Sequence, residues 1–209
     1  MAINLKKGQT INLEKSTHDL SSVTFGLGWK IAEKPQGFFK KLLGGGQEEC
    51  DLDAIAFVMD VDGKVRNLGD GLKESDVIFY GNLRHPSGCI VHTGDNLEGG
   101  SGVEDDEQIK IKLESLDERY QRILFLVTIY EGIKKNQHFG EVKGAFMRAV
   151  DANGKEMARF NLDQDNSYDN MRTVVFGEVY RHGSDWKFRA IGDSFQTDQF
   201  LEILRKHVD

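Results

Sequence analysis

The sequence predicts an all-β protein, a sandwich or a barrel, that ends in one short helix. Short runs of alternating apolar and polar residues recur along the chain, which is typical of strands in these folds. Glycine occurs 23 times and proline only twice. Glycine-containing pairs that favour tight turns separate several runs, at Asp62-Gly63, Asn153-Gly154 and His182-Gly183. The apolar spacing becomes helical only near the end of the chain.

Eleven runs are expected to form strands, because each combines strand-forming residues with turn residues at its ends. In the first half they are Thr10–Leu13, Ser22–Trp29, Asp51–Met59, Val77–Tyr80, Ile90–Thr93 and Glu107–Leu113. In the second half they are Arg122–Tyr130, Ala145–Asp151, Glu156–Leu162, Thr173–Arg181 and Trp186–Ile191.

Two of these strands also show which faces are buried. In Glu107–Leu113 every second residue is apolar, which predicts one buried face and one solvent-facing face. Arg122–Tyr130 is apolar on both faces, so we expect it in the middle of a sheet.

The final helix is predicted to follow Thr197, which suits an N-cap. Its last turn carries Arg205 and Lys206, which favour the negative end of the helix dipole. The residues at helical spacing are Phe200, Ile203, Leu204 and His207.

One segment, residues 31–49, interrupts the strand pattern. It contains three consecutive glycines and a small basic and apolar patch at residues 38–43. Two interpretations are open: a flexible surface loop, or a docking element for a partner or a membrane surface.

Length and composition indicate an ordinary globular protein. The 209 residues suit one large β domain or at most two small ones. The net charge of -7 argues against a nucleic-acid partner and makes metal cations natural partners. The two cysteines, Cys50 and Cys89, form no disulfide framework and lack metal-site spacing, which indicates a reducing compartment. No signal peptide or transmembrane stretch is visible, so we expect a cytoplasmic protein.

The segment Gly94–Glu107 carries the clearest chemical signal. Its sequence, GDNLEGGSGVEDDE, holds six acids and no lysine or arginine. Adjacent carboxylates repel one another unless they are fully solvated or a cation lies among them. Glycines allow backbone carbonyls to turn towards such a cation. Calcium binds six to eight hard oxygens in flexible loops, whereas magnesium prefers a rigid octahedral shell.

A second feature points to the same site. Asp51 and Asp53 lie on the face of their strand that carries Ile55 and Phe57, and Glu107 similarly heads a row of apolar residues. We expect these rows to face the core, and a divalent cation bridging the two strand heads would compensate the buried carboxylates. The alternative is that the acids are solvated strand ends.

Other candidate sites are weaker. The run Asp163-Gln-Asp165-Asn-Ser167-Tyr-Asp169 resembles half of a calcium loop, but a polar hairpin loop explains it better. The six histidines include no His-x-x-x-His pair, and no Gly-x-Ser-x-Gly motif or phosphate-binding loop occurs.

Three functions therefore stay open. The first is a non-catalytic calcium-binding protein. The second is a metal-dependent hydrolase that uses the same acids with His92 as base, which requires an open coordination position beside a pocket. The third is a metal-free scaffold whose acidic loop binds a basic partner.

Three runs in combination resemble the TerD family of tellurium-resistance and stress proteins: Asp51-Leu-Asp53-Ala54, His92-Thr-Gly-Asp95-Asn96 and Asp105-Asp-Glu107. The later stretch Phe176-Gly-Glu-Val-Tyr-Arg181 is similar to the same family, and the similarity extends to about Gly192. The chain departs from the family pattern at Glu98 and Glu104, which replace residues of the usual acidic loop.

The resemblance implies a single sandwich of two antiparallel sheets over residues 1–209, with a flexible insertion at 31–49. It implies bound Ca²⁺, no catalysis, and a cytoplasmic stress-response protein linked to tellurite resistance. The implied partners are other tellurium-resistance proteins, in a complex at the membrane. Carried over by position, the metal ligands are Asp51, Asp53, Asp95, Asn96, Asp105, Asp106 and Glu107.

Overall fold

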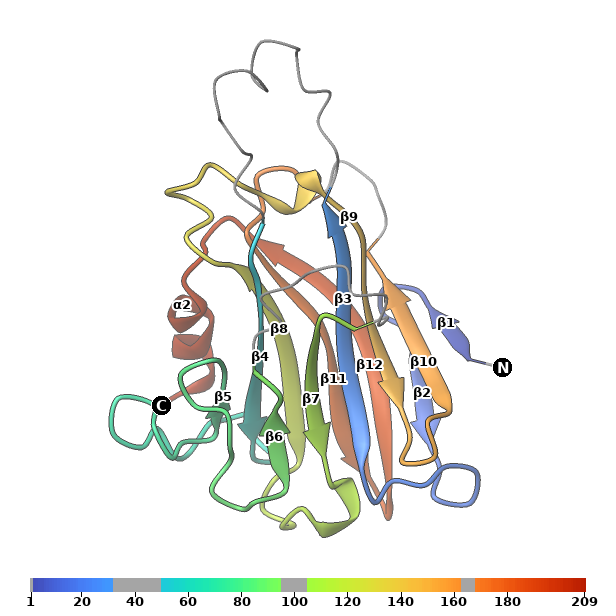
Figure 1. The fold of residues 1–209 in the computed structure, drawn as a ribbon. Coiled ribbons are helices and arrows are strands. Elements are labelled where there is room, and N and C mark those ends of the chain that lie inside the picture. The colour runs from blue at the N-terminus through green and yellow to red at the C-terminus, as the bar shows by residue number, and fades with distance from the viewer. Residues whose placement is uncertain (1, 32–49, 95–104, 163–167) are drawn as a thin grey trace.

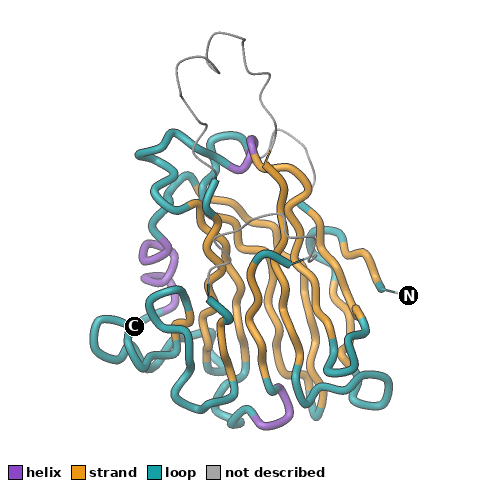
Figure 2. The backbone as a smooth tube through the Cα atoms, in the orientation of Figure 1, coloured by secondary structure: helices purple, strands orange, loops and turns teal. Residues whose placement is uncertain are grey.

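The chain folds into two six-stranded sheets packed face to face (Figures 1 and 2). The computed structural model describes residues 2–31, 50–94, 105–162 and 168–209. The first six strands are β1 (Ile3–Leu5), β2 (Thr10–Leu13), β3 (Val23–Ile31), β4 (Leu52–Met59), β5 (Val77–Ile78) and β6 (Ile90–His92). The others are β7 (Glu107–Ile111), β8 (Arg122–Ile129), β9 (Val142–Val150), β10 (Glu156–Asn161), β11 (Thr173–His182) and β12 (Asp185–Phe195).

The strand orders make this a sandwich rather than a closed barrel. The first sheet has the order β1-β10-β9-β3-β7-β6, and the second has the order β2-β12-β11-β8-β4-β5. Neighbouring strands run antiparallel, as expected, except that β1 pairs with β10 in parallel. The apolar strand β8 lies inside the second sheet, between β11 and β4, which confirms its predicted central position.

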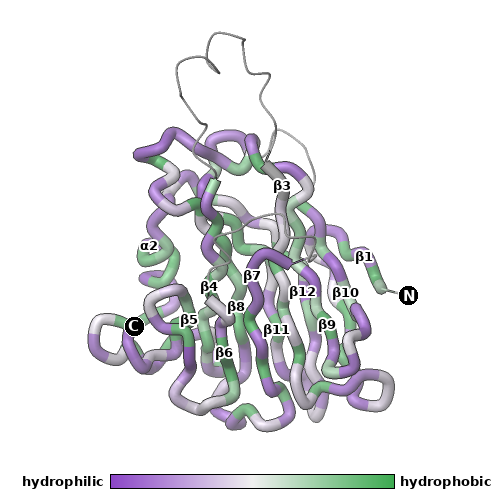
Figure 3. The backbone as a smooth tube through the Cα atoms, in the orientation of Figure 1, coloured by the Kyte–Doolittle hydropathy of each residue, from purple (hydrophilic) through white to green (hydrophobic). Residues whose placement is uncertain are grey.

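Two hydrophobic cores hold the fold together. The larger fills the space between the sheets, and the smaller lies on the outer face of the second sheet, under the C-terminal helix. Figure 3 shows the hydrophobic residues concentrated along the strands. All eight residues of β4 are buried, because the strand packs against a core on each face.

The existence of two cores changes the expectation that the β4 row carrying Asp53 and the β7 row headed by Glu107 face the same core. Leu52 and Ala54 contribute to the core between the sheets, whereas Ile55 and Phe57 contribute to the smaller outer core. Residues of one parity on a strand share one face. Asp53 therefore lies on the outer-core face, while the row headed by Glu107 faces the other sheet.

The C-terminal helix is shorter than its sequence spacing predicts. Helix α2 covers Phe200–Leu204 and continues as the 3-10 helix η4, Arg205–His207. The prediction of Thr197 as N-cap is wrong, because Gln199 occupies that position. Thr197 instead accepts the Gln199 N–H on its hydroxyl oxygen, which forms a turn before the helix.

The remaining regular elements are the 3-10 helices η1 (Leu113–Ser115) and η2 (Phe139–Glu141). Within the described residues, every helix is too short or too polar to cross a lipid bilayer. The insertion interpreted from the sequence at residues 31–49 lies, apart from its first residue, outside the described residues.

Two irregularities near the start of β7 position the acidic residues. Strand β7 pairs with β3 only as far as Glu107 and Leu27, which leaves the β3 backbone at Trp29 beyond the end of that ladder. Strand β5 pairs only with Ala56 and Phe57 of β4, which leaves the β4 backbone at Ala54 without a strand partner on that side.

Candidate functional site

Three consecutive acids at the start of β7 contact three different strands. Asp105 contacts β9, Asp106 contacts β3, and Glu107 contacts β4. The sequence predicts a cluster of carboxylates here, and the structure supplies each with a donor from the protein. Asp95 and Asn96, the other predicted ligands from this segment, lie outside the described residues.

Asp105 forms a two-point salt bridge with Arg148 of β9. The Arg148 Nε donates to Oδ1 at 2.7 Å and Nη2 donates to Oδ2 at 3.1 Å. The Gln108 side chain also donates to Oδ2, at 3.2 Å. The Asp105 side chain is only 2% exposed, so this bidentate pair is shielded from water.

Asp106 extends the contact between β7 and β3 beyond their last paired residues. Its Oδ2 accepts the backbone N–H of Trp29 at 3.0 Å, and its own N–H donates to the carbonyl of Leu27 at 2.7 Å. The β3–β7 ladder ends before Trp29, and the Asp106 carboxylate accepts the backbone N–H that lies beyond it.

Glu107 and His92 together satisfy the unpaired backbone of Ala54. The Ala54 N–H donates to Glu107 Oε2 at 2.5 Å, and His92 Nε2 lies 3.2 Å from the Ala54 carbonyl oxygen. The His92 ring nitrogen is also 3.6 Å from the same Glu107 oxygen. Two side chains of the first sheet therefore take the place of a strand neighbour of β4 and join the two sheets.

The hydrogen bonds of His92 define its tautomer. The Gly94 N–H donates to Nδ1 at 2.9 Å, so Nδ1 acts as an acceptor and the ring proton is on Nε2. That proton is directed at the Ala54 carbonyl. Both ring nitrogens are engaged, and His92 fixes the residue at which the acidic segment begins.

The remaining predicted ligands lie at the start of β4. Asp51 is exposed and its carbonyl accepts the Tyr130 N–H at 2.8 Å. Asp53 is 6% exposed and lies opposite Thr128 of β8. Asp53 belongs to β4 and Glu107 contacts β4 at Ala54, but Asp53 lies on the outer-core face of the strand whereas Glu107 reaches it from the other sheet.

Within the parts of the chain that the structure describes, no three His, Cys, Asp or Glu side chains gather closely enough to hold a metal ion. The side chains of Asp51, Asp53, Asp106 and Glu107 nevertheless carry carboxylate oxygens, which are the hard ligand atoms that calcium binds. Carboxylates that already accept one N–H can coordinate a cation through their second oxygen.

A second buried polar cluster has no counterpart in the sequence predictions. Asp76 Oδ1 lies 3.1 Å from His85 Nε2 and accepts the Tyr120 hydroxyl at 3.1 Å, and Oδ2 accepts the Asn67 N–H at 2.9 Å. Burial and the Asp76 carboxylate raise the pKa of Tyr120 to about 12. Tyr120 lies 44 residues from Asp76 in the sequence, so no local spacing pattern indicates the complete cluster.

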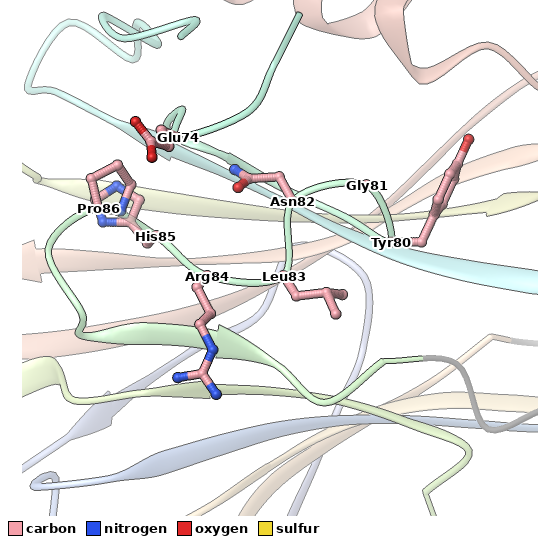
Figure 4. A pocket seen from close by; sticks show the side chains of 8 residues that line it. All are labelled: Glu74, Tyr80, Gly81, Asn82, Leu83, Arg84, His85 and Pro86. Carbon is pink, nitrogen blue, oxygen red and sulfur yellow. The ribbon is translucent and has the colours of Figure 1, made fainter. Parts of the chain in front are cut away.

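Next to this cluster lies an open groove of about 760 Å³ on the segment that links the two sheets (Figure 4). Its lining includes the exposed side chains of Tyr80 and Leu83 and the buried Asn82. The Asn82 amide donates to backbone oxygens of residues 75 and 77, which explains why it is buried. None of the predicted metal ligands lines this groove.

Cys50 is a buried thiol. Burial, with a further contribution from the Glu141 carboxylate, raises the pKa of Cys50 to about 12. A thiol in this state is a poor nucleophile and a poor metal ligand. Cys50 therefore acts as a packing residue of the core between the sheets.

Comparison with known proteins gives a consistent picture. The chain is 47% identical over 214 residues to the tellurium resistance protein TerX of Serratia marcescens, and the match covers 100% of both chains. It is 39% identical to the stress response protein SCP2 of Bacillus subtilis, again over 100% of both. It is 40% identical to the tellurium resistance protein TerD of Serratia marcescens, over 93% of this chain and 92% of that one.

A solved structure shares the fold. The crystal structure of a telluride resistance protein (TerD) homologue from Streptomyces coelicolor superposes with a TM-score of 0.59 at 19% identity, over 87% of this chain and 94% of that chain. The family profile described as the TerD domain matches residues 1–207. With the full-length relatives, this match shows that the chain belongs to the TerD family of tellurium-resistance and stress-response proteins.

Proposed function

We propose that this chain binds Ca²⁺ through the acidic segment 94–107 and the neighbouring head of β4. The observation that carries the proposal is that both ends of this segment are fixed at one place. The Gly94 N–H is hydrogen-bonded to the His92 ring, and the Ala54 N–H is hydrogen-bonded to the Glu107 carboxylate. The side chains of His92 and Glu107 are 3.6 Å apart. The two described ends of the segment therefore lie close together, and a cation bound between them would offset the repulsion among the carboxylates of the segment.

The proposed ligands are oxygens. Asp95 and Asn96 follow directly after the residue fixed by His92, and Asp106 and Glu107 end the segment. Asp51 and Asp53 would contribute from the start of β4. Calcium accepts a shell of mixed carboxylate, amide, carbonyl and water oxygens, so this donor set fits it better than magnesium.

We further propose that the protein is not an enzyme. Both ring nitrogens of His92 are used in hydrogen bonds, so the ring has no nitrogen left to act as a general base. The relatives are named as tellurium resistance and stress response proteins.

The proposed cellular role is a cytoplasmic stress response that includes tellurite resistance. The names of the relatives support it. In this role calcium would stabilise one end of the sandwich, because a ligand that binds only the folded state raises its stability. The stabilised surface would then be recognised by other proteins of the tellurium-resistance set in a complex at the membrane.

The test is calorimetric titration of Ca²⁺ into chelator-stripped protein, with Mg²⁺ as the competing ion. We expect saturable, calcium-selective binding and a higher melting temperature. Asp95→Ala and Asp106→Asn should each reduce the calcium-dependent rise in melting temperature by more than half. At 100 times the dissociation constant, the wild-type protein should gain about 2.7 kcal/mol.

The matched control is Glu202→Ala, which removes an exposed carboxylate on α2 and should leave calcium binding unchanged. If no heat of binding is measured and the melting temperature does not move, the metal-binding proposal is wrong. Binding of a basic protein that persists in chelator would then favour the metal-free scaffold.

A further inference from the structure

We propose that Asp105 and Arg148 form a structural clasp, and that Arg148 is a positioning residue for the calcium site. The clasp fixes the end of the acidic segment to the first sheet and so sets the places of Asp106 and Glu107. This inference rests on the proposed calcium binding. It assigns Asp105 to Arg148 rather than to the metal shell that the family resemblance implies.

The hydrogen bonds of Asp105 support this role. Its two oxygens accept three hydrogen bonds, two from Arg148 and one from Gln108. A guanidinium keeps its charge at any physiological pH, and its planar fork matches a carboxylate. A cation that recruited Asp105 would have to displace this two-point contact in a site where the Arg148 side chain is only 16% exposed.

The backbone of β3 is adapted to the clasp. A Cβ atom built on Gly26 would overlap the Asp105 carboxylate, so only glycine leaves room for it. Gly26 pairs with Gln108 on one side and with Arg148 on the other. The carboxylate therefore lies over the centre of the first sheet, between the two residues that bind it.

Arg148 is itself held in place by a second carboxylate. Its Nη1 donates to Glu156 Oε2 at 3.1 Å, and Arg159 binds the same carboxylate at 2.9 Å. Hydrogen bonds from Arg159 and then Arg148 lower the pKa of Glu156. Arg159 and Glu156 of β10, Arg148 of β9 and Asp105 therefore form one continuous network of ion pairs on the outer face of the first sheet.

The clasp determines the geometry of the proposed site through the chain itself. Asp105 is one residue before Asp106 and two before Glu107, and these accept the N–H groups of Trp29 and Ala54. If Asp105 is released, the start of β7 can move and both contacts weaken. Residues that orient metal ligands typically change metal affinity by about 10- to 100-fold.

The experiment measures calcium affinity for Arg148→Gln, Asp105→Asn and the double variant. Each single variant should weaken calcium binding by about tenfold with the number of ions unchanged. The double variant should be no weaker than the singles, because both remove one interaction. The control is Arg189→Gln, which removes a half-exposed guanidinium of β12 in the second sheet and should keep nearly wild-type affinity.

The opposite pattern would overturn the inference. If Asp105 is a ligand that Arg148 merely competes for, Asp105→Asn weakens binding and Arg148→Gln tightens it. Arg148→Lys guards against a variant that fails to fold, because it keeps the charge and loses only the fork. It should give an intermediate affinity.

Melting in chelator separates the two proposals. Without calcium, Arg148→Gln and Asp105→Asn should lower the melting temperature by the same amount, about 4 °C, and the double variant should add nothing. If the wild-type protein binds no calcium, the positioning role is wrong, and equal, non-additive losses show that the clasp is structural only. Additive losses would contradict the clasp itself.

Discussion

At the residue scale, buried charges near the acidic segment are compensated from unexpected directions. The segment Gly94–Glu107 contains no lysine or arginine, so the sequence predicts a bound cation as the compensating charge. The structure supplies Arg148 for Asp105, although the two are 43 residues apart in sequence. Local sequence shows which groups need a partner but not which partner a distant strand delivers.

The same principle applies to Tyr120, whose hydroxyl donates to Asp76 inside the protein. The ordinary pKa of tyrosine is 10.0, and in the folded protein burial and Asp76 raise that of Tyr120 to about 12. Between these values the folded state keeps a proton that the unfolded state has released. Stability from this group is therefore complete below pH 10 and is lost as the pH rises through 12.

We expect Tyr120→Phe to remove this part of the pH dependence. Between pH 9 and pH 11.5, the denaturant midpoint of unfolding should fall further in the wild-type protein than in the variant. Other groups that titrate at high pH are common to both proteins, so the difference isolates Tyr120. Equal falls in the two proteins would show that the Asp76 contact does not hold the tyrosine proton.

At the element scale, most strands follow from the sequence, because alternation and glycine turns specify them directly. Strand β2 has the predicted bounds and most others differ at one or both ends by one to four residues. Strand β1 was missed, since its three residues are too few to show a period. The faces of β4 were also not predictable: a strand buried on both sides shows no contrast between its two rows.

The short edge strand β5 gives the element-scale prediction. Because β5 ends early, Glu107 substitutes for a strand neighbour by accepting the Ala54 N–H. Glu107→Ala leaves this buried donor without its acceptor and should cost about 1–3 kcal/mol of unfolding free energy. Glu107→Gln keeps a carbonyl oxygen at the same place and should cost less.

Both Glu107 variants should be measured by urea denaturation in excess chelator, so that any calcium contribution is excluded. A lower unfolding free energy for Glu107→Ala than for Glu107→Gln then reports the contact with the Ala54 N–H. If the two variants are equally stable without calcium, the contact with Ala54 contributes nothing, and the need for Glu107 would be confined to metal binding.

At the scale of the whole molecule, the chain builds a third layer. The two sheets enclose one core, and the C-terminal helix covers a second core on the outer face of the second sheet. The predicted ligands are divided by this arrangement, since Asp53 belongs to the face of the second core and Glu107 to the face of the first. The expected proximity of the starts of β4 and β7 is present as the contact between Ala54 and Glu107, but the face on which each acid lies depends on the tertiary packing.

The helix is tied to the fold by backbone contacts as well as by packing. The Val65 N–H donates to the carbonyl of His207 at 2.8 Å, and the Lys64 ammonium donates to that of Val208 at 2.8 Å. These bonds hold the helix over β4 and β8, so the outer core should unfold together with the sandwich. Independent melting of the helix is not expected, because its five α-helical residues are too few to be stable alone.

A matched pair of helix variants tests this cooperative coupling. Ile203 is 3% exposed and packs in the outer core, whereas its neighbour Leu201 is 42% exposed. Ile203→Ala should cost about 2–5 kcal/mol, the range for apolar truncation in a core, and Leu201→Ala less than about 0.5 kcal/mol. Circular dichroism and tryptophan fluorescence should follow one transition in both variants, because both tryptophans, Trp29 and Trp186, pack in or against the core between the sheets. Two separated transitions in Ile203→Ala would mean that the outer core melts on its own and that the helix is a detachable cover.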